Sequence, residues 1–534
     1  MLGLMQQQPL LVSSFIRHAA RNHGAVEVVS RIGEDTIHRT TYAEVEQRAR
    51  VLANALQRLG VKHGDRVATL AWNSYRHLEL YYAISGIGAV CHTVNPRLAL
   101  DDIAYIVNHA EDVVLFADTG LAGLVTALAP LVRDTVRTVV MMTDAATMPE
   151  VTVAPGMNLG CYETLMAEAD AADAWPEFDE NTAAALCYTS GTTGRPKGAM
   201  LSHGNLLHNV ESCRQVLQYA NDDRMAVLLP MFHSFMLCVG VFLPMLMGGS
   251  IVLIRSLHPP RNVLLEITLR KATILPAIPQ FFRSMTAATL TTPLPLRMAI
   301  SGAAPLPVQI LTEFSQKFPF PLIEGYGLSE ASPVVTKNPL KGVRKAGSIG
   351  LPIPNVEVSI QDDDGRMLET GEIGELCVRG GNVMMGYWNQ PEETAKALRG
   401  GWLLTGDIGY RDADGYYFIT DRKKDMLLVN GINVYPREVE ETLYQFPGVK
   451  EASVIGVPDA RKGEQPLAFV VANEGTALEE KAILQFVRSK LADYKAPRRV
   501  VFLEALPRNA TGKVVKTALR EMAGKGMAMA EQAD

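Results

Sequence analysis

The chain has 534 residues, more than one hydrophobic core usually supports, so at least two domains are expected. Hydrophobic residues make up 48% of it, charged residues 20%, and the net charge is −6, which argues against a disordered chain and against a general nucleic-acid binder. The six cysteines form no Cys-x-x-Cys pair, which disfavours a zinc site or a disulfide scaffold. Without an export or lipidation signal at either end, we expect a cytoplasmic protein.

The N-terminal part alternates strands and helices. A capping box at Thr41 to Glu44 opens an amphipathic helix whose apolar residues recur at helical spacing. A strand, a helix and a second strand are then predicted at 66–72, 73–82 and 89–94, with Asn73 or Ser74 as the helix cap. Two strands joined by a helix usually lie parallel in one sheet, and similar alternation continues to about residue 420. This pattern predicts an α/β fold.

The stretch LCYTSGTTGRPKGAMLSHGN, residues 186–205, breaks from a buried strand into a turn of small residues followed by a lysine. Backbone N–H groups and hydroxyls in such a turn form a nest for oxyanions, and Lys197 adds a positive charge, so we place ATP here. The spacing differs from a Walker A loop because Gly198, not Ser or Thr, follows the lysine, and the magnesium ligand must lie elsewhere. A hairpin without a ligand would need only one or two such residues. The turn residues are Thr189, Ser190, Gly191, Thr192, Thr193 and Gly194.

The most apolar tract, Phe235 to Ile254, is long enough to suggest a membrane helix. Pro244 and the small residues 248–250 divide it into a helix-length piece and a strand-length piece. We therefore predict a buried helix followed by a strand, and no transmembrane segment.

Three later stretches place polar or small residues at turns after apolar runs. Glu324 to Glu330, EGYGLSE, offers an aromatic face, a flexible backbone and a carboxylate suited to a magnesium ion. Ser301 to Pro305, SGAAP, has side chains too small to obstruct a ligand. Trp402 to Asp407, WLLTGD, ends in a carboxylate suited to two neighbouring ribose hydroxyls. Each stretch taken alone is also compatible with an ordinary turn or cap.

The last hundred residues predict a small α+β domain. Five consecutive charges at Asp421 to Asp425 separate it from the preceding strands. Its basic region, residues 488–520, contains nine Lys or Arg and either receives a polyphosphate or forms a solubilising face. The elements predicted here are a helix with Pro436 near its start, strands at 452–457 and 467–472, and a helix at 478–491.

The stretch YTSGTTGRPKGAMLSH resembles the phosphate-loop motif of the adenylate-forming superfamily, which includes acyl-CoA synthetases, peptide-synthetase adenylation domains and beetle luciferases. YGLSE at 326–330, TGD at 405–407 and PRNATGK at 507–513 resemble later motifs of that superfamily, in the same order. The resemblance implies a large N-terminal domain of parallel and mixed sheets flanked by helices, a hinge and a small mobile C-terminal domain. The boundaries that we assign are 1–421, 422–425 and 426–534.

The resemblance also implies ATP, Mg²⁺ and coenzyme A as ligands and assigns roles to individual residues. Lys513, Glu330, His233 and Thr189 form the catalytic set, Glu330 and Thr189 hold the metal, and Lys424 is the hinge. The nucleotide is assigned to Thr189, Ser190, Gly191, Thr192, Thr193, Gly194, Lys197, Gly302, Ala303, Ala304, Glu324, Gly325, Tyr326, Gly327, Ser329, Asp407, Ile419, Arg422 and Lys513. The acyl pocket is assigned to His233, Phe235, Met236, Leu237, Gly302 and Pro333, and coenzyme A to Gly431, Ile432 and Asn433.

The stretch 230–254, PMFHSFMLCVGVFLPMLMGGSIVLI, contains no Asp, Glu, Lys or Arg. An enzyme that activates amino acids normally needs a carboxylate for the substrate ammonium, since an unpaired buried charge is costly. This stretch therefore favours an apolar acid, although its residues are also compatible with plain core. The opening third resembles medium-chain and methylthiopropionate CoA ligases, whereas FHSFMLCVG is more similar to longer-chain fatty-acid ligases.

We therefore expect a fatty-acid–CoA ligase that forms an acyl-adenylate and then the thioester. The alternatives are a methylthiopropionate-CoA or aryl-CoA ligase and a fatty acyl-AMP ligase that loads a carrier protein. A luciferase-like oxygenase would need an imported luciferin, and a non-catalytic nucleotide sensor would not need all of Lys197, Glu330, Asp407 and Lys513. Nucleic acid is not expected as a partner, and a homodimer is left open.

Overall fold

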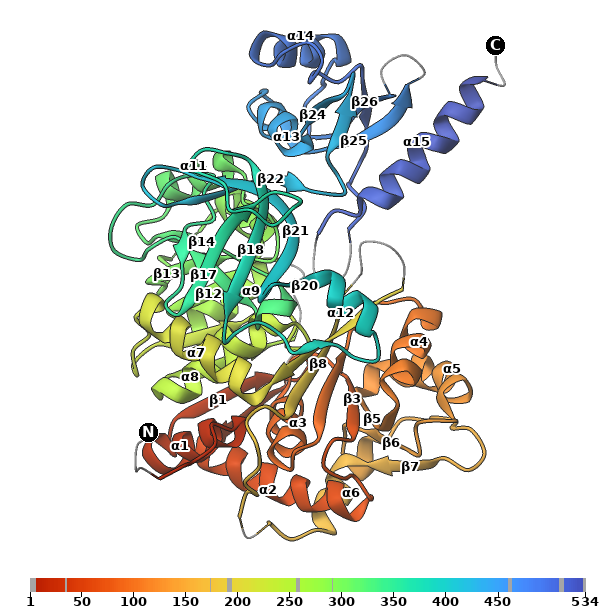
Figure 1. Ribbon diagram of the computed structural model, residues 1–534. Helices are drawn as coiled ribbons and strands as arrows, with labels where there is room; N and C mark the ends of the chain where they lie inside the picture. Colours follow the sequence, from red (N-terminus) through yellow and green to blue (C-terminus); the bar gives the residue numbers. More distant parts are fainter. Residues whose placement is uncertain are drawn as a thin grey trace.

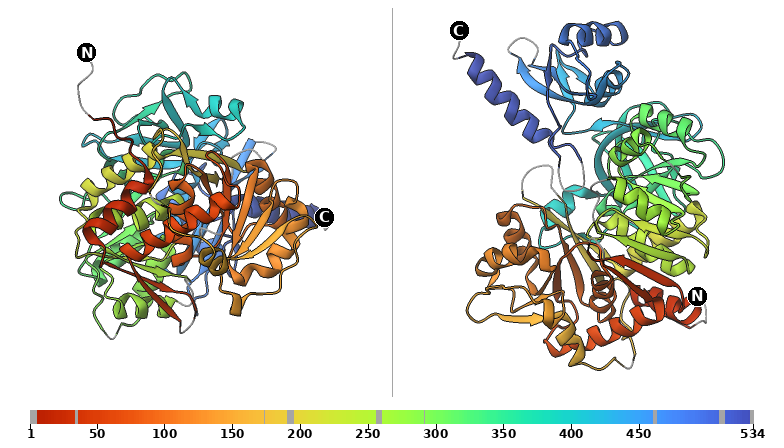
Figure 2. Two further views of the ribbon diagram at one scale, coloured as in Figure 1. Left: turned by 90° about the horizontal axis from the view of Figure 1, so that it is seen from below. Right: turned by 180° about the vertical axis from the view of Figure 1, so that it is seen from behind.

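The structure is a computed structural model that describes residues 6–33, 36–172, 174–189, 195–255, 260–290, 292–459, 463–508 and 513–531. Figure 1 shows a large body that carries three sheets and, above it, a smaller part formed by the blue end of the chain. Seen from behind, the smaller part lies above the large body (Figure 2), and the two are in contact, with the Arg283 guanidinium 5.7 Å from the centre of the Tyr444 ring. The predicted α/β class is confirmed.

The first sheet contains the strand that leads into the phosphate turn. Its eight strands are ordered β19-β9-β8-β4-β3-β5-β6-β7. The predicted parallel pairing of the first two strands is confirmed, with Val67 opposite Cys91. The strands are β3 Arg66–Leu70, β4 Val90–Val94, β5 Asp112–Ala117, β6 Thr138–Met141, β7 Asn158–Cys161, β8 Ala183–Thr189, β9 Lys197–Ser202 and β19 Gly386–Tyr387.

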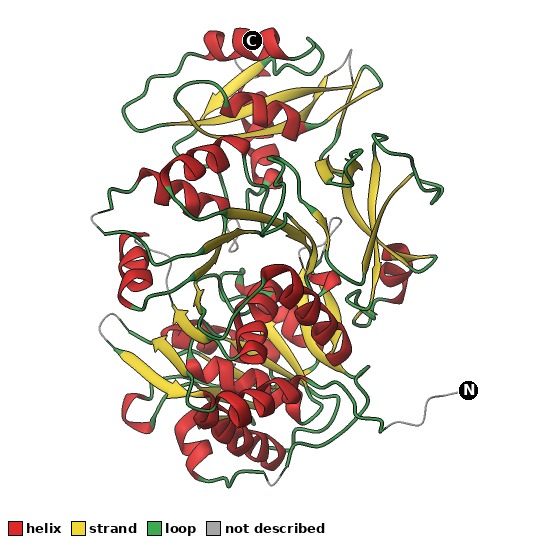
Figure 3. Cartoon of the chain, turned by 90° about the vertical axis from the view of Figure 1, so that its left-hand side faces the viewer, coloured by secondary structure: helices red, strands yellow, loops and turns green. Residues whose placement is uncertain are grey.

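The second sheet carries the end of the uncharged stretch 230–254, called the apolar wall below, and the starts of the stretches SGAAP, residues 301–305, and EGYGLSE, residues 324–330. Its nine strands follow the order β16-β15-β14-β13-β12-β10-β11-β1-β2, and many of the helices of the large body gather around its strands (Figure 3). Its strands are β1 Glu27–Arg31, β2 Ile37–Thr41, β10 Arg224–Val227, β11 Ser250–Ile254, β12 Ile274–Ala277, β13 Met298–Ser301, β14 Leu322–Gly327, β15 Val334–Lys337 and β16 Leu351–Pro352.

A third, antiparallel sheet places the TGD motif next to the charged segment that follows it. It consists of β17 Val356–Gln361, β18 Gly374–Gly380, β20 Leu398–Arg399, β21 Trp402–Arg411 and β22 Tyr417–Arg422.

The smaller part has its own sheet and its own hydrophobic clusters. The predicted helix that begins at Pro436 is confirmed, as are the two predicted strands and the second helix. Its elements are β23 Leu427–Val429, β24 Ile432–Val434, α13 Pro436–Tyr444, β25 Val449–Asp459, β26 Gly463–Ala472, α14 Glu480–Lys490, β27 Arg499–Phe502 and α15 Lys516–Glu531.

The predicted helix caps of the large body are confirmed. The Thr41 backbone N–H donates to Glu44 Oε2 at 2.8 Å, which completes the capping box of α2. Ser74, not Asn73, caps α3, and its hydroxyl accepts the His77 N–H at 3.2 Å. The helices are α1 Val12–His23, α2 Tyr42–Arg58, α3 Tyr75–Gly86, α4 Leu100–Ala110, α5 Ala122–Val132, α6 Tyr162–Ala167, α7 His203–Leu217, α8 Leu243–Met247, α9 Pro260–Leu269, α10 Pro279–Ala287, α11 Val308–Lys317 and α12 Pro391–Ala397, with short helices η1 Thr119–Leu121, η2 Ala145–Thr147 and η4 Ser329–Ala331.

The most apolar tract forms a buried helix followed by a strand, as predicted. It begins with a seven-residue π-helix, η3 Met236–Phe242, continues into α8 and ends in β11. All seven π-helix residues are buried, and π-helical turns occur frequently at functional sites. In the part of the chain that the structure describes, no helix is both long and apolar enough to cross a membrane.

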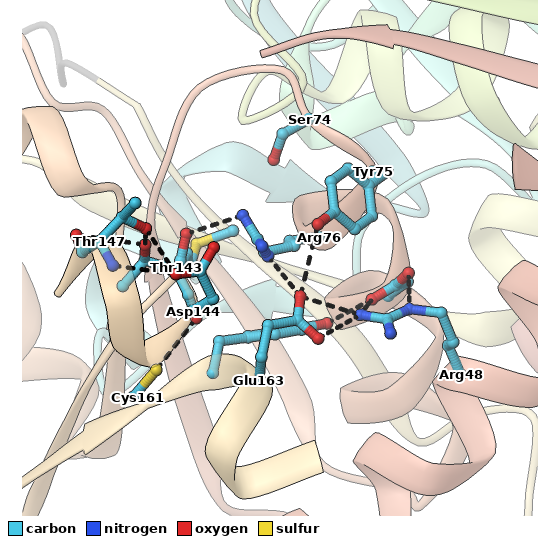
Figure 4. A network of polar contacts seen from close by, with 12 residues as sticks. Arg48, Ser74, Tyr75, Arg76, Thr143, Asp144, Thr147, Cys161 and Glu163 are labelled. Atoms are coloured by element: carbon cyan, nitrogen blue, oxygen red, sulfur yellow. Dashed lines mark hydrogen bonds and ion pairs between the residues drawn. The ribbon is translucent and has the colours of Figure 1, made fainter. Parts of the chain in front are cut away.

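Three helices of the N-terminal part are joined by a buried polar network (Figure 4). Arg48 Nε on α2 lies 2.6 Å from Glu79 Oε1 on α3, and the Tyr162 hydroxyl on α6 donates to Glu79 Oε2 at 2.6 Å. Glu163 accepts from Arg48 at 3.1 Å and from Arg76 at 2.8 Å. Burial raises the pKa of Glu79, whereas Arg48 opposes that rise. The network is saturated with internal partners, so we interpret it as structural.

Lys337, the last residue of β15, is a buried amine whose Nζ has no hydrogen-bond partner among the described residues. Lys337 is only 6% exposed, and burial lowers the pKa of its amine from 10.5 to about 7. An unfolded chain binds this proton between about pH 7 and 10.5 and the folded chain does not, so this group destabilises the fold at neutral pH.

We expect Lys337→Met to raise the melting temperature at pH 7 by about 2 °C or more, equivalent to about 2 kcal/mol of unfolding free energy. The gain should be full below about pH 7 and shrink as the pH rises toward 10.5, above which both folded and unfolded chains hold a mostly neutral amine. Thermal scans across pH check this, with the exposed Lys341→Met as matched control. A lower melting temperature for Lys337→Met would show that the amine is stabilised by a partner.

Candidate active site

The ends of the predicted phosphate turn lie side by side. Thr189 ends β8, Lys197 begins β9, and the two residues are opposite each other in an antiparallel pair. The predicted strand before the turn and the returning strand after it are thus confirmed. The turn residues Ser190, Gly191, Thr192, Thr193 and Gly194 lie outside the described residues.

The two predicted magnesium ligands are in contact although 141 residues separate them. The Thr189 hydroxyl donates to Glu330 Oε1 at 3.1 Å, and the Tyr387 hydroxyl donates to the same oxygen at 3.0 Å. Among the described residues no cluster of three or more His, Cys, Asp or Glu could hold a metal. One carboxylate and one hydroxyl fit Mg²⁺, which takes few protein ligands and completes its shell with phosphate oxygens and water.

Lys197 also lies at this corner, and its ammonium pairs with the Glu393 carboxylate of α12. The Lys197 ammonium stands 5.3 Å from the centre of the Tyr387 ring. Neither Tyr387 nor Glu393 was identified from the sequence, because they reach this corner through the pairing of β19 with β9, which no local pattern indicates.

A second group of residues assigned to the nucleotide lies around Asp407, the predicted ribose ligand. The Tyr326 hydroxyl donates to Asp407 Oδ2 at 2.6 Å, and Arg422 Nε lies 3.5 Å from Asp407 Oδ1. Asp407 and Arg422 face each other on β21 and β22. Ile419 of β22 and Tyr326 pack against the same small hydrophobic cluster. The four residues therefore lie together, with a carboxylate at their centre.

The stretches SGAAP and EGYGLSE lie at the ends of two neighbouring strands, where Ser301 is opposite Glu324. Glu324 Oε1 accepts the Leu306 N–H at 3.2 Å, whereas Oε2 is buried without a partner among the described residues. Burial raises the pKa of Glu324 to about 7. Since an exocyclic amine of a base can donate to such an oxygen, Glu324 fits its predicted nucleotide role. Ala303 and Ala304 follow in the same turn, and Gly325, Gly327 and Ser329 continue the second motif.

The apolar wall contacts these motifs directly. A Cβ added to Gly302 would stand 3.1 Å from the Phe235 ring, so a larger residue at 302 would push into the wall. Ser234 Oγ lies 3.2 Å from Ser329 Oγ. Met236 and Leu237 are buried, and the next residue of the π-helix, Cys238, donates its thiol to the Ser332 carbonyl beside Pro333. The stretch assigned to the acyl group thus lies next to residues assigned to the nucleotide.

His233 lies at the start of this wall as a neutral imidazole. Burial lowers its pKa to about 4. Its Nδ1 lies 3.2 Å from the Phe235 backbone N and accepts that N–H, so the ring proton resides on Nε2. The histidine is therefore a hydrogen-bond donor at neutral pH and not a cation.

Lys513 of the small part lies close enough to Arg422 and Asp407 for both charges to influence its pKa. Burial is the main cause that lowers its pKa to about 7, with Arg422 adding to the decrease and Asp407 opposing it. The structure therefore brings Lys513 to the ribose and phosphate corner.

The predicted coenzyme A residues are in a different place. Gly431, Ile432 and Asn433 form the tip and second strand of the β23–β24 hairpin, where Gly431 has φ of 78° and Ile432 is 47% exposed. Within the described residues no hydrogen bond joins these three residues to the large body. Lys513 therefore lies near Arg422 and Asp407, whereas the coenzyme A hairpin makes no described hydrogen bond to the large body.

In comparison with known protein families, residues 15–388 of the chain match the AMP-binding enzymes, and residues 438–513 match the C-terminal domain of AMP-binding enzymes. The chain belongs to the AMP-binding enzyme family. It is 38% identical over 543 residues to a 3-methylmercaptopropionyl-CoA ligase of Ruegeria lacuscaerulensis, covering 98% of both chains. A medium-chain-fatty-acid–CoA ligase of Ectopseudomonas oleovorans is 35% identical, again over 98% of both.

Among solved structures, ATP-bound MatB from Rhodopseudomonas palustris superposes with a TM-score of 0.85 and 33% identity, over 96% of this chain and 99% of that one. An anthranilate CoA ligase in complex with anthranoyl-AMP superposes with a TM-score of 0.89 and 27% identity, over 98% and 99%. The fold of this AMP-binding enzyme is therefore that of the adenylate-forming acyl-CoA synthetases, as expected.

Proposed function

We propose that this enzyme activates a fatty acid of medium length or longer. The chain is an acid–CoA ligase and uses ATP, Mg²⁺ and coenzyme A. The observation that supports an apolar acid is the contact between Phe235 and Gly302, which joins an uncharged wall to the nucleotide motifs. An acyl chain that enters along this wall has its carboxylate at the end where ATP is assigned, and the wall offers no charge to hold a second polar group.

The proposed first step is attack of the carboxylate oxygen on the α-phosphorus of ATP, with pyrophosphate as the leaving group. Asp407 orients the ribose through its two hydroxyls, and Lys513 and Arg422 face the phosphates with their positive charges. Thr189 and Glu330 would hold Mg²⁺, which when bound offsets the charge of the phosphate oxygens. No side-chain nucleophile is required, because the substrate supplies the attacking oxygen.

His233 has a separate proposed role at the acyl end. Since its Nε2 carries the ring proton, it can donate a hydrogen bond to a carboxylate or acyl oxygen without changing its charge. Its low pKa means that this donor persists from about pH 5 upward.

The second step needs another orientation of the small domain. We propose domain boundaries at 1–421 and 426–534, with the hinge at 422–425 and Lys424 as the pivot. Lys513 lies near Arg422 and Asp407, whereas the hairpin Gly431–Asn433 is exposed at Ile432 and has no described hydrogen bond to the large body, which supports adenylation as the step served by the present orientation. Rotation about the hinge would move Lys513 away from the nucleotide and bring the hairpin to it. The coenzyme A thiol would then attack the acyl carbonyl and release AMP.

A panel of acids tests the proposal. We expect octanoate and longer saturated acids to exceed acetate and every amino acid in kcat/KM, because each buried methylene contributes about 0.8 kcal/mol, roughly fourfold, until the pocket is full. The measurements are pyrophosphate release and AMP formation, each with and without coenzyme A. Equal turnover of acetate and octanoate would contradict the proposed acyl class.

The same panel decides between this proposal and its alternatives. The relatives include 3-methylmercaptopropionyl-CoA ligases and a feruloyl-CoA synthase, which favour a short thioether acid or an aryl acid as the second candidate. Preference for 3-(methylthio)propanoate or for a hydroxycinnamate over octanoate would select that candidate. Adenylate formation without turnover on added coenzyme A would instead select a carrier protein as the acceptor.

A further inference from the structure

The ammonium of Lys197, assigned to the phosphates of ATP, already has an anionic partner. It pairs with the Glu393 carboxylate, and the two side chains are only 15% and 26% exposed. Glu393 also lies 2.6 Å from the Lys396 ammonium through its other oxygen. The ion pairs with these two lysines lower the pKa of Glu393 to about 2, so it is ionised at every physiological pH.

Helix α12, which carries Glu393, is linked by hydrogen bonds to the strands beside Lys197. The Tyr387 N–H donates to Thr394 Oγ1 at 2.9 Å, and the Trp388 N–H donates to the Gly198 carbonyl at 2.8 Å. These bonds attach the start of α12 to β9, the strand of Lys197, and Figure 1 shows α12 near the upper end of β8. Glu393 is therefore carried near Lys197 by a helix that is bonded through Thr394 to β19, which in turn is bonded to β9.

The Lys197–Glu393 pair is also linked, through Tyr387, to the residues assigned to magnesium. Tyr387 places its ring beside the Lys197 ammonium and its hydroxyl on Glu330. Because Lys197 and Glu330 are both assigned to MgATP and both contact Tyr387, phosphate oxygens bound here and the Glu393 carboxylate would compete for one ammonium.

We propose that Glu393 is an internal counter-anion for Lys197, which releases the lysine when MgATP binds and takes it back when pyrophosphate leaves. This inference rests on the proposed ATP site. Because Glu393 competes for Lys197, the apparent affinity for both phosphate ligands is reduced in proportion to the fraction of the lysine that is not paired with Glu393. Glu393 thus acts through Lys197 as a positioning residue that favours departure of pyrophosphate and opposes reversal of the first step.

The test compares Glu393→Gln with Glu392→Gln, which removes the same charge from the neighbouring, exposed residue. Calorimetry with MgATP and with magnesium pyrophosphate, without any acid, should show about five- to tenfold tighter binding of both ligands to Glu393→Gln. Glu392→Gln should bind as the parent does. In steady state, Glu393→Gln should have a lower KM for ATP and a correspondingly lower inhibition constant for pyrophosphate, with no gain in kcat. The difference should shrink as salt is raised.

Glu393→Asp, which keeps the charge, should stay within about twofold of the parent in both affinities. If Glu393→Gln only lowers the melting temperature and leaves both affinities at the parent values, the pair is structural and the proposal is wrong. Weaker binding to Glu393→Gln would also overturn it, because the carboxylate would then support the phosphate site. A parent protein that binds no MgATP would refute the proposed ATP site itself, and this outcome is distinct from unchanged affinities in the variant.

Discussion

Lys513→Ala is expected to lose about 10²-fold or more in acyl-adenylate formation while retaining thioester formation. During adenylation the ammonium of Lys513 reaches the corner formed by Arg422 and Asp407, where negative charge builds as pyrophosphate leaves. Loss of one such electrostatic donor has an effect of about this size. Burial lowers the pKa of Lys513 to about 7, and the same low-dielectric surroundings strengthen the attraction of its protonated form to phosphate.

In the proposed second step the small domain turns so that the hairpin Gly431–Asn433 approaches the acyl carbonyl, and Lys513 then leaves the site. Chemically prepared acyl-adenylate and coenzyme A should therefore be converted by Lys513→Ala at close to the parent rate. The two half-reactions are measured on the same preparation, with Lys490→Ala, on α14, as a control for the loss of one positive charge from the small domain. A comparable loss in both half-reactions would show that Lys513 is structural or that the domain does not alternate.

Lys424→Pro is expected to show the opposite pattern. Lys424 lies in the turn between β22 and β23, which is closed by the Asp425 N–H donating to the Arg422 carbonyl at 2.9 Å. No described hydrogen bond uses the Lys424 N–H, so proline removes none of the bonds of the present orientation. It fixes φ near −65°, however, and obstructs the rotation that thioester formation requires.

We expect the overall ligation rate of Lys424→Pro to fall by about 10²-fold or more, with the adenylation rate within a few-fold of the parent. Pyrophosphate release in a single turnover and acyl-CoA formation from prepared adenylate separate the two effects. Lys424→Ala keeps the backbone free and should retain both rates. Equal losses in both half-reactions of Lys424→Pro would mean that position 424 shapes the adenylating orientation, and unchanged ligation would exclude it as the hinge.

Much of the fold was predictable because its determinants are local. The capping box at Thr41 and the cap at Ser74 act within one helical turn, and the strands on either side of the phosphate turn follow from short apolar runs. The helix and strand of the apolar tract were also predictable, since Pro244 and the glycines after it act on their own backbone. The π-helical winding of η3 was not predicted, because it depends on how buried side chains pack around it.

The sequence by itself therefore determined the α/β class, the order of the motifs and the chemical type of each candidate site residue, because each depends on neighbouring residues along the chain. Only the tertiary structure decided which side chains meet. Thr189 reaches Glu330 across 141 residues and Lys197 reaches Glu393 across 196. The buried Lys337 amine also has no local signal. Contacts of this kind depend on sheet pairing and on burial, which remove water from charges far apart in sequence and so set their partners and their pKa values.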